Sequence, residues 1–270
     1  MDGEVCALLW PLAERLIEET TPAPFPLNCD GLRRSPGRLD VIGGISDYSG
    51  GLVLQMPIAE ATFAACQLRR PAQTGTPTLT AVSLRGSLPS APAVHAGEDG
   101  HTARRFEHSL APLFEGEGAA RATLSGAGWG AYVAGAVAEV VAEAGRRGEG
   151  LSAETLAADL AIVVWSEVPE GRGVASSAAP EVATVGAVAG VLGVALEPMR
   201  WAVLAYFVET RIGESSSECG DGGGCTARLA QYAQLFGNCS GRRVRHHGSS
   251  GGLHGQRGTR SGHPLPGQRQ

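Results

Sequence analysis

The sequence contains no lysine: all 22 of its basic side chains are arginines. This absence excludes any mechanism that needs a lysine nucleophile, and it excludes the phosphate-binding lysine of a P-loop. The sequence also lacks a hydrophobic run long enough to cross a bilayer, and acidic Asp2 and Glu4 stand where a signal peptide carries positive charge. We therefore expect a cytoplasmic protein with no membrane partner.

Paired cysteines are also lacking. None of the six cysteines belongs to a CxxC pair, and no histidine stands at zinc-finger spacing from Cys219 and Cys225. The spacing argues against a zinc site, and buried or incidental thiols are the better interpretation.

Charge is unevenly distributed, although the net charge is only −5. From Ser240 onward the chain has six arginines, four histidines and no acidic residue. Residues 241–270 have almost no apolar periodicity, so they cannot bury enough surface to offset the entropy of ordering. We expect a disordered basic tail. A nucleic-acid-binding arm is the weaker alternative, because no aromatic residues are interleaved with the arginines.

Hydrophobic periodicity predicts alternating helices and strands. Helical spacing is found in residues 7–19, 132–145, 180–192 and 199–212, and strand patterns in residues 39–41, 52–58, 78–84 and 161–165. A tight turn at Gly50-Gly51 would join the first two strands, whereas residues 86–126 carry little signal and are expected to be mostly loop. The alternation indicates an α+β or α/β domain.

The most informative segment is residues 35–51, with the sequence SPGRLDVIGGISDYSGG. Arg38 precedes an apolar strand, and a glycine-rich turn after the strand presents Asp47 and Tyr48. This arrangement suits a polyhydroxylated ligand: the backbone approaches the ring, a carboxylate accepts from hydroxyls, and a guanidinium serves a nearby phosphate. The alternative interpretation of Asp47 is a turn-forming aspartate.

A second segment, the glycine loop, comprises residues 168–178 (VPEGRGVASSA), between a predicted buried strand and an apolar helix. Backbone N–H groups of such a loop converge on an anion, and the positive end of the helix dipole adds to the attraction. Ser176 and Ser177 would donate to phosphate or hold Mg²⁺, which prefers hard oxygen ligands. Taken alone, the loop is better explained as a strand–turn–helix with serine N-caps.

Together the two segments resemble the first two motifs of the GHMP kinase superfamily, and within it the sugar 1-kinases galactokinase and L-arabinokinase. Residues 169–178 are similar to the second motif, Pro-x-Gly-x-Gly-[Leu/Val]-x-Ser-Ser-Ala. The resemblance implies an α+β GHMP kinase N-terminal domain, of the ribosomal protein S5 domain 2-like fold, over residues 31–212. An N-terminal helix and linker (1–30) would precede it, and the Gly/Ser/Arg tail (213–270) would follow.

The resemblance also implies a function. The protein would transfer the γ-phosphoryl group of ATP, with Mg²⁺ as cofactor, to the anomeric hydroxyl of L-arabinose or galactose. Arg38 would lie beside the transferred phosphoryl group as a catalytic residue. The sugar would be bound by Gly44, Asp47 and Tyr48.

The nucleotide and the metal ion would be held further along the chain. The residues implied for the nucleotide are Gly171, Gly173, Val174, Ala175, Ser176 and Ser177. Mg²⁺ would be held by Ser177 and by Glu209, because residues 208–212 resemble the helix end that carries the family's magnesium-binding glutamate. Without the resemblance, a solvated helix residue is the favoured interpretation of Glu209.

The choice of sugar depends on two adjacent positions of the first motif. Galactokinases have a Glu-His pair where this chain has Gly44 and Ile45, and that glutamate serves the 6-hydroxyl end of the sugar. L-Arabinose in its pyranose form lacks the C6 hydroxymethyl group. The replacement favours the pentose, because a carboxylate without a partner in a buried site is costly.

The catalytic aspartate of the family is not found. It belongs to a Cys-Gly-x-Met-Asp-Gln segment that this sequence lacks, and the neighbours of Asp221 do not match it, so Asp221 is not assigned as the base. By the resemblance a second domain would follow near residue 213, where the arginine-rich tail stands instead, and a frame change or mis-spliced exon there would explain both differences. The alternative function is a catalytically inactive or truncated relative that retains partial ATP and sugar binding.

Overall fold

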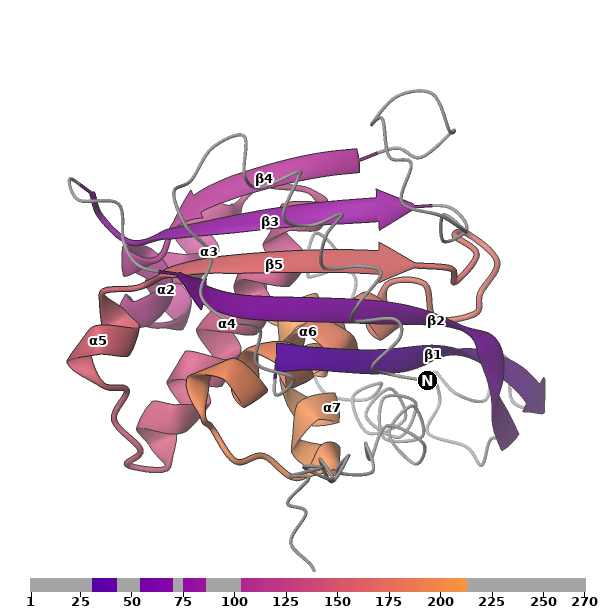
Figure 1. Ribbon diagram of the computed structural model, residues 1–270. Helices are drawn as coiled ribbons and strands as arrows, with labels where there is room; N and C mark the ends of the chain where they lie inside the picture. Colours follow the sequence, from indigo (N-terminus) through magenta and orange to yellow (C-terminus); the bar gives the residue numbers. More distant parts are fainter. Residues whose placement is uncertain (1–30, 43–53, 70–74, 86–102, 213–270) are drawn as a thin grey trace, which may run out of the picture. The chain divides into compact units, whose positions relative to one another are not determined.

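A five-stranded mixed sheet with helices on one face forms the described part of the protein (Figure 1). The computed structural model describes residues 31–42, 54–69, 75–85 and 103–212, all within Met1–Ser240, the first of two units of the chain. The predicted helix at 7–19, the Gly50-Gly51 turn and the tail at 213–270 lie outside these residues. No helix in the described ranges is both long and apolar enough to span a membrane.

The strands lie in the order β1-β2-β5-β3-β4. β1 (Leu32–Ile42) and β5 (Asp159–Ser166) both pair antiparallel with β2 (Leu54–Arg69). β3 (Thr78–Arg85) runs parallel to β5 and antiparallel to β4 (Ala103–Ser109). β1 and β4 are therefore the two edges of the sheet.

The helices fall into two groups along the chain. Between β4 and β5 lie α2 (Ala111–Glu115), α3 (Glu117–Leu124), α4 (Trp129–Arg146) and α5 (Ala153–Leu156). After β5 come α6 (Ala178–Leu192), α7 (Pro198–Phe207) and a π-helical turn, η3 (Val208–Ile212), that continues α7. α6 lies against β1 and β2, and α4 packs on α6.

The main core lies between the sheet and these helices. Its largest fully buried side chains include Leu79 of β3, Ile162 of β5 and Leu204 of α7. α4 and α6 contribute mainly alanine and valine to this core, and α6 is buried almost all round, so its apolar residues form no single stripe. A second apolar cluster lies on the opposite face of the sheet, where the rings of Phe63 and Trp165 stack 5.2 Å apart.

The structure confirms the predicted strands at 78–84 and 161–165 and the predicted helices at 132–145 and 180–192. The expectation of loop over residues 86–126 is wrong for residues 103–124, which form β4, α2 and α3. β4 is an edge strand in which Arg104, Arg105 and Glu107 are exposed, so it shows little apolar alternation. α2 is too short to show a helical period.

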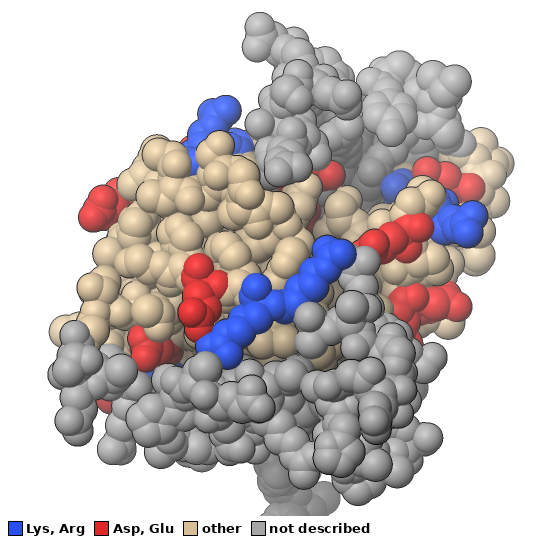
Figure 2. Space-filling model, turned by 90° about the horizontal axis from the view of Figure 1, so that it is seen from above, with Lys and Arg blue, Asp and Glu red and all other residues tan. Residues whose placement is uncertain are grey.

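The β4 edge carries charges of both signs. Arg105 and Glu107 form an ion pair along the strand. Figure 2 looks down on the molecule from the β4 side of Figure 1 and shows arginine and acidic side chains close together beside a broad uncharged surface. Such mixed charge on an exposed strand discourages edge-to-edge pairing with another chain.

An ion pair between helices ties α7 to α4. Glu143 of α4 is only 6% exposed and accepts two hydrogen bonds from Arg200 of α7, at 2.8 and 2.6 Å. Nε of Arg146 donates to the same carboxylate at 2.9 Å. The hydrogen bonds from Arg200 hold the pKa of Glu143 below its ordinary value, against the effect of burial.

The buried position of Ile162 gives a first prediction. Ile162→Ala should lower the free energy of unfolding by about 2–5 kcal/mol, because it removes a fully buried side chain from the middle strand of the sheet. Met199→Ala, at a side chain that is 59% exposed, should change it by less than about 0.5 kcal/mol. Urea unfolding of the full chain measures both. Equal effects of the two changes would contradict the described core.

The Glu143–Arg200 pair predicts a pH dependence. A carboxyl whose pKa is lowered on folding stabilises the fold above its ordinary pKa, and this contribution is lost as the pH falls through the folded value. Arg200→Ala should therefore cost roughly 1 kcal/mol at pH 7, a modest figure because solvent screens the partly exposed Arg200.

This cost should shrink as the pH falls through the lowered pKa of Glu143, because the carboxyl is then protonated in both proteins. Thermal unfolding of the wild type and the variant between pH 3 and pH 7 measures it. The matched control is Arg121→Ala, at an exposed arginine of α3. A cost for Arg200→Ala that stays constant over this range would show that the pair is not responsible.

Candidate functional site

The first motif and the glycine loop meet at the β1 edge of the sheet. The backbone N–H of Arg38 in β1 donates to the carbonyl of Val174 in the glycine loop, at 3.0 Å. Gly37 permits this approach, because a Cβ there would lie 2.8 Å from the side chain of Ile58 and 3.0 Å from that of Val168. The ladder between β1 and β2 is irregular between Pro36 and Arg38, where an edge strand tolerates a proline. Segments more than 130 residues apart are thus joined by backbone.

The Arg38 side chain is held by a neighbour on its own strand. Its Nη1 donates to Oδ1 of Asp40 at 2.6 Å, and Arg38 is only 9% exposed. Residues two apart in a strand lie on the same face, so the Asp40 carboxylate is within reach of the Arg38 guanidinium. The sequence prediction missed Asp40 as a site residue. The signal that would have found it is the spacing of two between an arginine and an aspartate in a predicted strand.

The glycine loop has a backbone suited to binding an anion. Gly171, Gly173 and Ala175 all have positive φ, at 67°, 70° and 64°. Alternation of left-handed residues with their neighbours turns successive N–H groups toward one side and forms an anion-binding concavity. Nothing lies within 4 Å of a Cβ built on Gly171 or Gly173, so these glycines are needed for conformation rather than space.

Within the ranges that the structure describes, Ala175 is the one non-glycine residue with a positive φ. An L-residue in this region carries steric strain, and such strain concentrates at ligand-binding sites. The carbonyl of Ala175 accepts the first hydrogen bond of α6 from the N–H of Ala179, at 3.0 Å. The strained residue therefore sets the point at which the loop becomes a helix.

Ser177 occupies the N-cap of α6 but makes no capping hydrogen bond. Its Oγ instead donates to Oε1 of Glu209 in η3, at 3.5 Å. The interpretation of the loop as a plain turn with a serine cap is therefore wrong for Ser177. The structure brings together the two side chains that the sequence assigned to Mg²⁺, although they are 32 residues apart.

The donor set of this pair fits Mg²⁺. A serine hydroxyl and a carboxylate are hard oxygen donors, and Mg²⁺ in nucleotide sites commonly takes one or two protein oxygens and completes its shell with phosphate and water. Ser177 is exposed and Glu209 half-buried, so both are accessible to a ligand. In the described ranges no three His, Cys, Asp or Glu side chains gather as a metal site. A metal ion here would depend on the nucleotide for its other ligands.

The other expected site residues are placed as follows. Val174 and Ser176 lie on the glycine loop and are half-buried. The sugar-binding residues Gly44, Asp47 and Tyr48, and the unassigned Asp221, lie outside the described residues.

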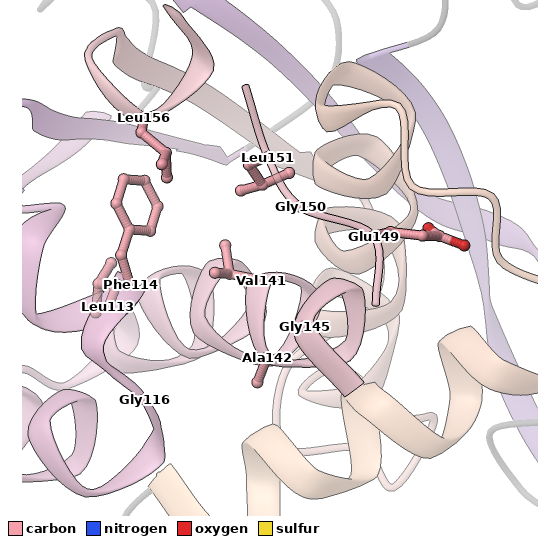
Figure 3. Close-up of a pocket in the computed structure, with 10 residues that line it drawn as sticks. All are labelled: Leu113, Phe114, Gly116, Val141, Ala142, Gly145, Glu149, Gly150, Leu151 and Leu156. Carbon is pink, nitrogen blue, oxygen red and sulfur yellow. The ribbon is translucent and has the colours of Figure 1, made fainter. Parts of the chain in front are cut away.

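A pocket of about 260 Å³ lies elsewhere, between α2, the second half of α4 and the segment that leads to α5 (Figure 3). Its walls are apolar and include Phe114, Val141, Leu151 and Leu156, while the carboxylate of Glu149 points away from the cavity. It shares no residue with the glycine loop, Arg38 or Glu209. The pocket is therefore not part of the candidate site.

Comparison with known protein families gives two matches. The model of the GHMP kinases N terminal domain matches residues 131–227, and that of the galactokinase galactose-binding signature matches residues 27–68. L-Arabinokinase from Arabidopsis thaliana is 34% identical over 236 residues, which cover 76% of this chain and 21% of the relative. The chain thus spans about a fifth of the length of that relative.

Two solved structures illustrate the structural likeness. Methanococcus jannaschii mevalonate kinase is similar with a TM-score of 0.48 and 15% identity, over 67% of this chain and 46% of that chain. Lactococcus lactis galactokinase complexed with galactose is similar with a TM-score of 0.48 and 20% identity, over 76% of this chain and 43% of that chain.

The strained loop residue gives a prediction about stability. Ala175→Val should lower the free energy of unfolding by about 1–2 kcal/mol, because a β-branched side chain is disfavoured at positive φ. Ala175→Gly should leave it unchanged or raise it by up to about 1 kcal/mol. Ala142→Gly, in the interior of α4, should instead lower it by about 1 kcal/mol. Denaturant unfolding compares the three, and the same sign for both glycine variants would contradict the described loop.

Proposed function

We propose that this chain, which carries a GHMP kinase N-terminal domain and a galactokinase-like signature, is an ATP-dependent sugar 1-kinase of the arabinokinase and galactokinase type. The reaction is transfer of the γ-phosphoryl group of ATP to the anomeric hydroxyl of a sugar. Homology to L-arabinokinase and the galactose-binding signature support a sugar kinase rather than another member of the superfamily.

The observation that carries the proposal is the hydrogen bond between Arg38 and Val174. It brings the arginine of the first motif to the rim of the loop that has the backbone of a phosphate site. A phosphoryl group held there would meet loop N–H groups and the N-terminus of α6 on one side and the Arg38 guanidinium on the other. Neither segment would form such a site alone.

Each site residue that the structure describes has a role in this proposal. Residues 171–177 bind the phosphates of ATP through the backbone, while Ser177 and Glu209 supply oxygen ligands to Mg²⁺. The bound ion would neutralise charge on the phosphates during transfer. Arg38, oriented by Asp40, stabilises the charge on the transferring phosphoryl group.

The proposed sugar is L-arabinose before galactose. The name of the 34% identical relative agrees with this order, and Gly44 and Ile45 replace the Glu-His pair whose glutamate serves the 6-hydroxyl end of the sugar in galactokinases. Asp47 and Tyr48 would bind the ring hydroxyls. The proposed location in the cytoplasm stays a prediction, as do the domain boundaries; the family match continues past residue 212 to residue 227.

A second candidate function is an inactive or truncated relative that retains partial ATP and sugar binding. The specific observation in its favour is the absence of the Cys-Gly-x-Met-Asp-Gln segment from the sequence. Without that aspartate no residue is assigned to orient or deprotonate the acceptor hydroxyl.

A coupled assay of ADP release tests the proposal. We expect turnover with ATP, Mg²⁺ and L-arabinose that exceeds turnover with D-galactose. Glu209→Ala should reduce kcat/KM by at least about 100-fold, because it removes a ligand of the ion that neutralises the phosphates. Glu197→Ala, at an exposed glutamate next to α7, is the matched control and should leave the rate unchanged.

Binding measurements separate the two candidate functions. No turnover with either sugar, together with Mg²⁺-dependent ATP binding that Glu209→Ala abolishes, would support the inactive relative. A chain with neither turnover nor nucleotide binding would overturn both.

A further inference from the structure

The turn that carries Glu209 is wound differently from the helix before it. α7 ends at Phe207, and Val208–Ile212 continue it as a π-helical turn. A π-helical turn takes up more residues than an α-helical one, is rare, and is frequently found at functional sites. The direction in which Glu209 points therefore depends on whatever holds this turn.

α4 holds the turn by close packing. Val208 and Ile212 are buried, and they face Gly135 of α4. A Cβ at residue 135 would lie 3.0 Å from Cγ1 of Val208 and 3.2 Å from Cδ1 of Ile212. Such a contact is tighter than nine in ten real Cβ contacts, so a larger residue at 135 would force Val208 or Ile212 to shift by a few tenths of an ångström.

Ion pairs made by Arg211 also hold this turn. Nη1 of Arg211 lies 3.0 Å from Oε2 of Glu117 in α3 and 3.8 Å from Oε1 of Glu139 in α4. Its guanidinium carbon also lies 3.8 Å from the ring centroid of Phe207, at cation–π distance. Arg211 thereby fastens η3 to two helices and to the end of α7.

Glu139 is an unusual residue for a structural core. It is only 2% exposed, and burial raises the pKa of its carboxyl despite the nearby Arg211 and Arg146. It stands four residues after Gly135, so both lie on the face of α4 that meets η3. A buried carboxylate adds little net stability compared with an apolar residue, and orientation is the better account of its presence.

We propose that Arg211 and Glu139 are positioning residues, which together with Gly135 fix η3 against α4 so that the Glu209 carboxylate faces Ser177. The inference rests on the proposed function, because it makes these two residues the outer support of the Mg²⁺ site. Neither residue contacts the site itself; both act through Glu209. Outer-shell partners of this kind change metal affinity by about 10–100-fold when they are removed.

The experiment measures Mn²⁺ binding to the full chain in the presence of a non-hydrolysable ATP analogue, by calorimetry. Arg211→Gln and Glu139→Gln should each weaken Mn²⁺ binding by about 10–100-fold. Arg211→Lys keeps the charge but loses the planar guanidinium that meets two carboxylates and the Phe207 ring, so it should recover only part of the affinity. Glu209→Ala removes the proposed ligand itself, so its Mn²⁺ affinity is the lowest that the other variants should reach.

The matched control is Arg200→Gln. It breaks the other ion pair between α7 and α4, the one with Glu143, without touching η3. It should lower the melting temperature about as much as Arg211→Gln does but leave Mn²⁺ affinity unchanged. Hydrogen exchange at the amides of residues 208–212 should be faster in Arg211→Gln and not in Arg200→Gln.

Three results would overturn the inference. If Arg211→Gln binds Mn²⁺ as the wild type does while Glu209→Ala does not, the inference fails and the proposed function stands. If Arg211→Gln and Arg200→Gln weaken binding equally, Arg211 contributes only to general stability. If the wild type binds no Mn²⁺ with the nucleotide analogue, the proposed function fails and the inference fails with it.

Discussion

The hydrogen bond from the backbone of Arg38 to the carbonyl of Val174 is the contact on which the candidate site depends. β1 is an edge strand, so one side of its backbone is not used by the sheet. A loop from beyond the neighbouring strands occupies that side at Arg38, and Gly37 leaves room for it. A Cβ at residue 37 would crowd the side chains of Ile58 and Val168, which would both have to shift.

The rest of the site is built outward from this contact by rigid elements. The glycine loop is fixed between β5, which is buried in the sheet, and α6, which is buried among β1, β2 and α4. η3 is fixed by α4, which packs on the same α6. Ser177 and Glu209 therefore meet because two separate supports share one helix. A site held in this way needs little rearrangement to bind a ligand, which lowers the entropic cost of binding.

Secondary structure and loops could be predicted from the sequence wherever a local residue pattern dictates them. The apolar run at 161–165 predicted β5, and the glycines at 171 and 173 predicted a loop after it, in which both glycines have positive φ. Prediction from the sequence failed where tertiary contacts decide. The π-helical turn η3, packed closely against Gly135 of α4, is revealed by no helical period in the sequence. Asp40, by contrast, was missed although its spacing of two from Arg38 is a local signal.

The serine at the start of α6 has a consequence for the energetics of the whole chain. Ser177 directs its hydroxyl to Glu209 and does not cap the helix, so the first turn of α6 has no side-chain cap. An anion bound at this terminus would act as the cap, and its binding energy would then be part of the folding energy. The folded fraction of the chain would then rise with the concentration of any anion that binds this terminus in the folded state alone.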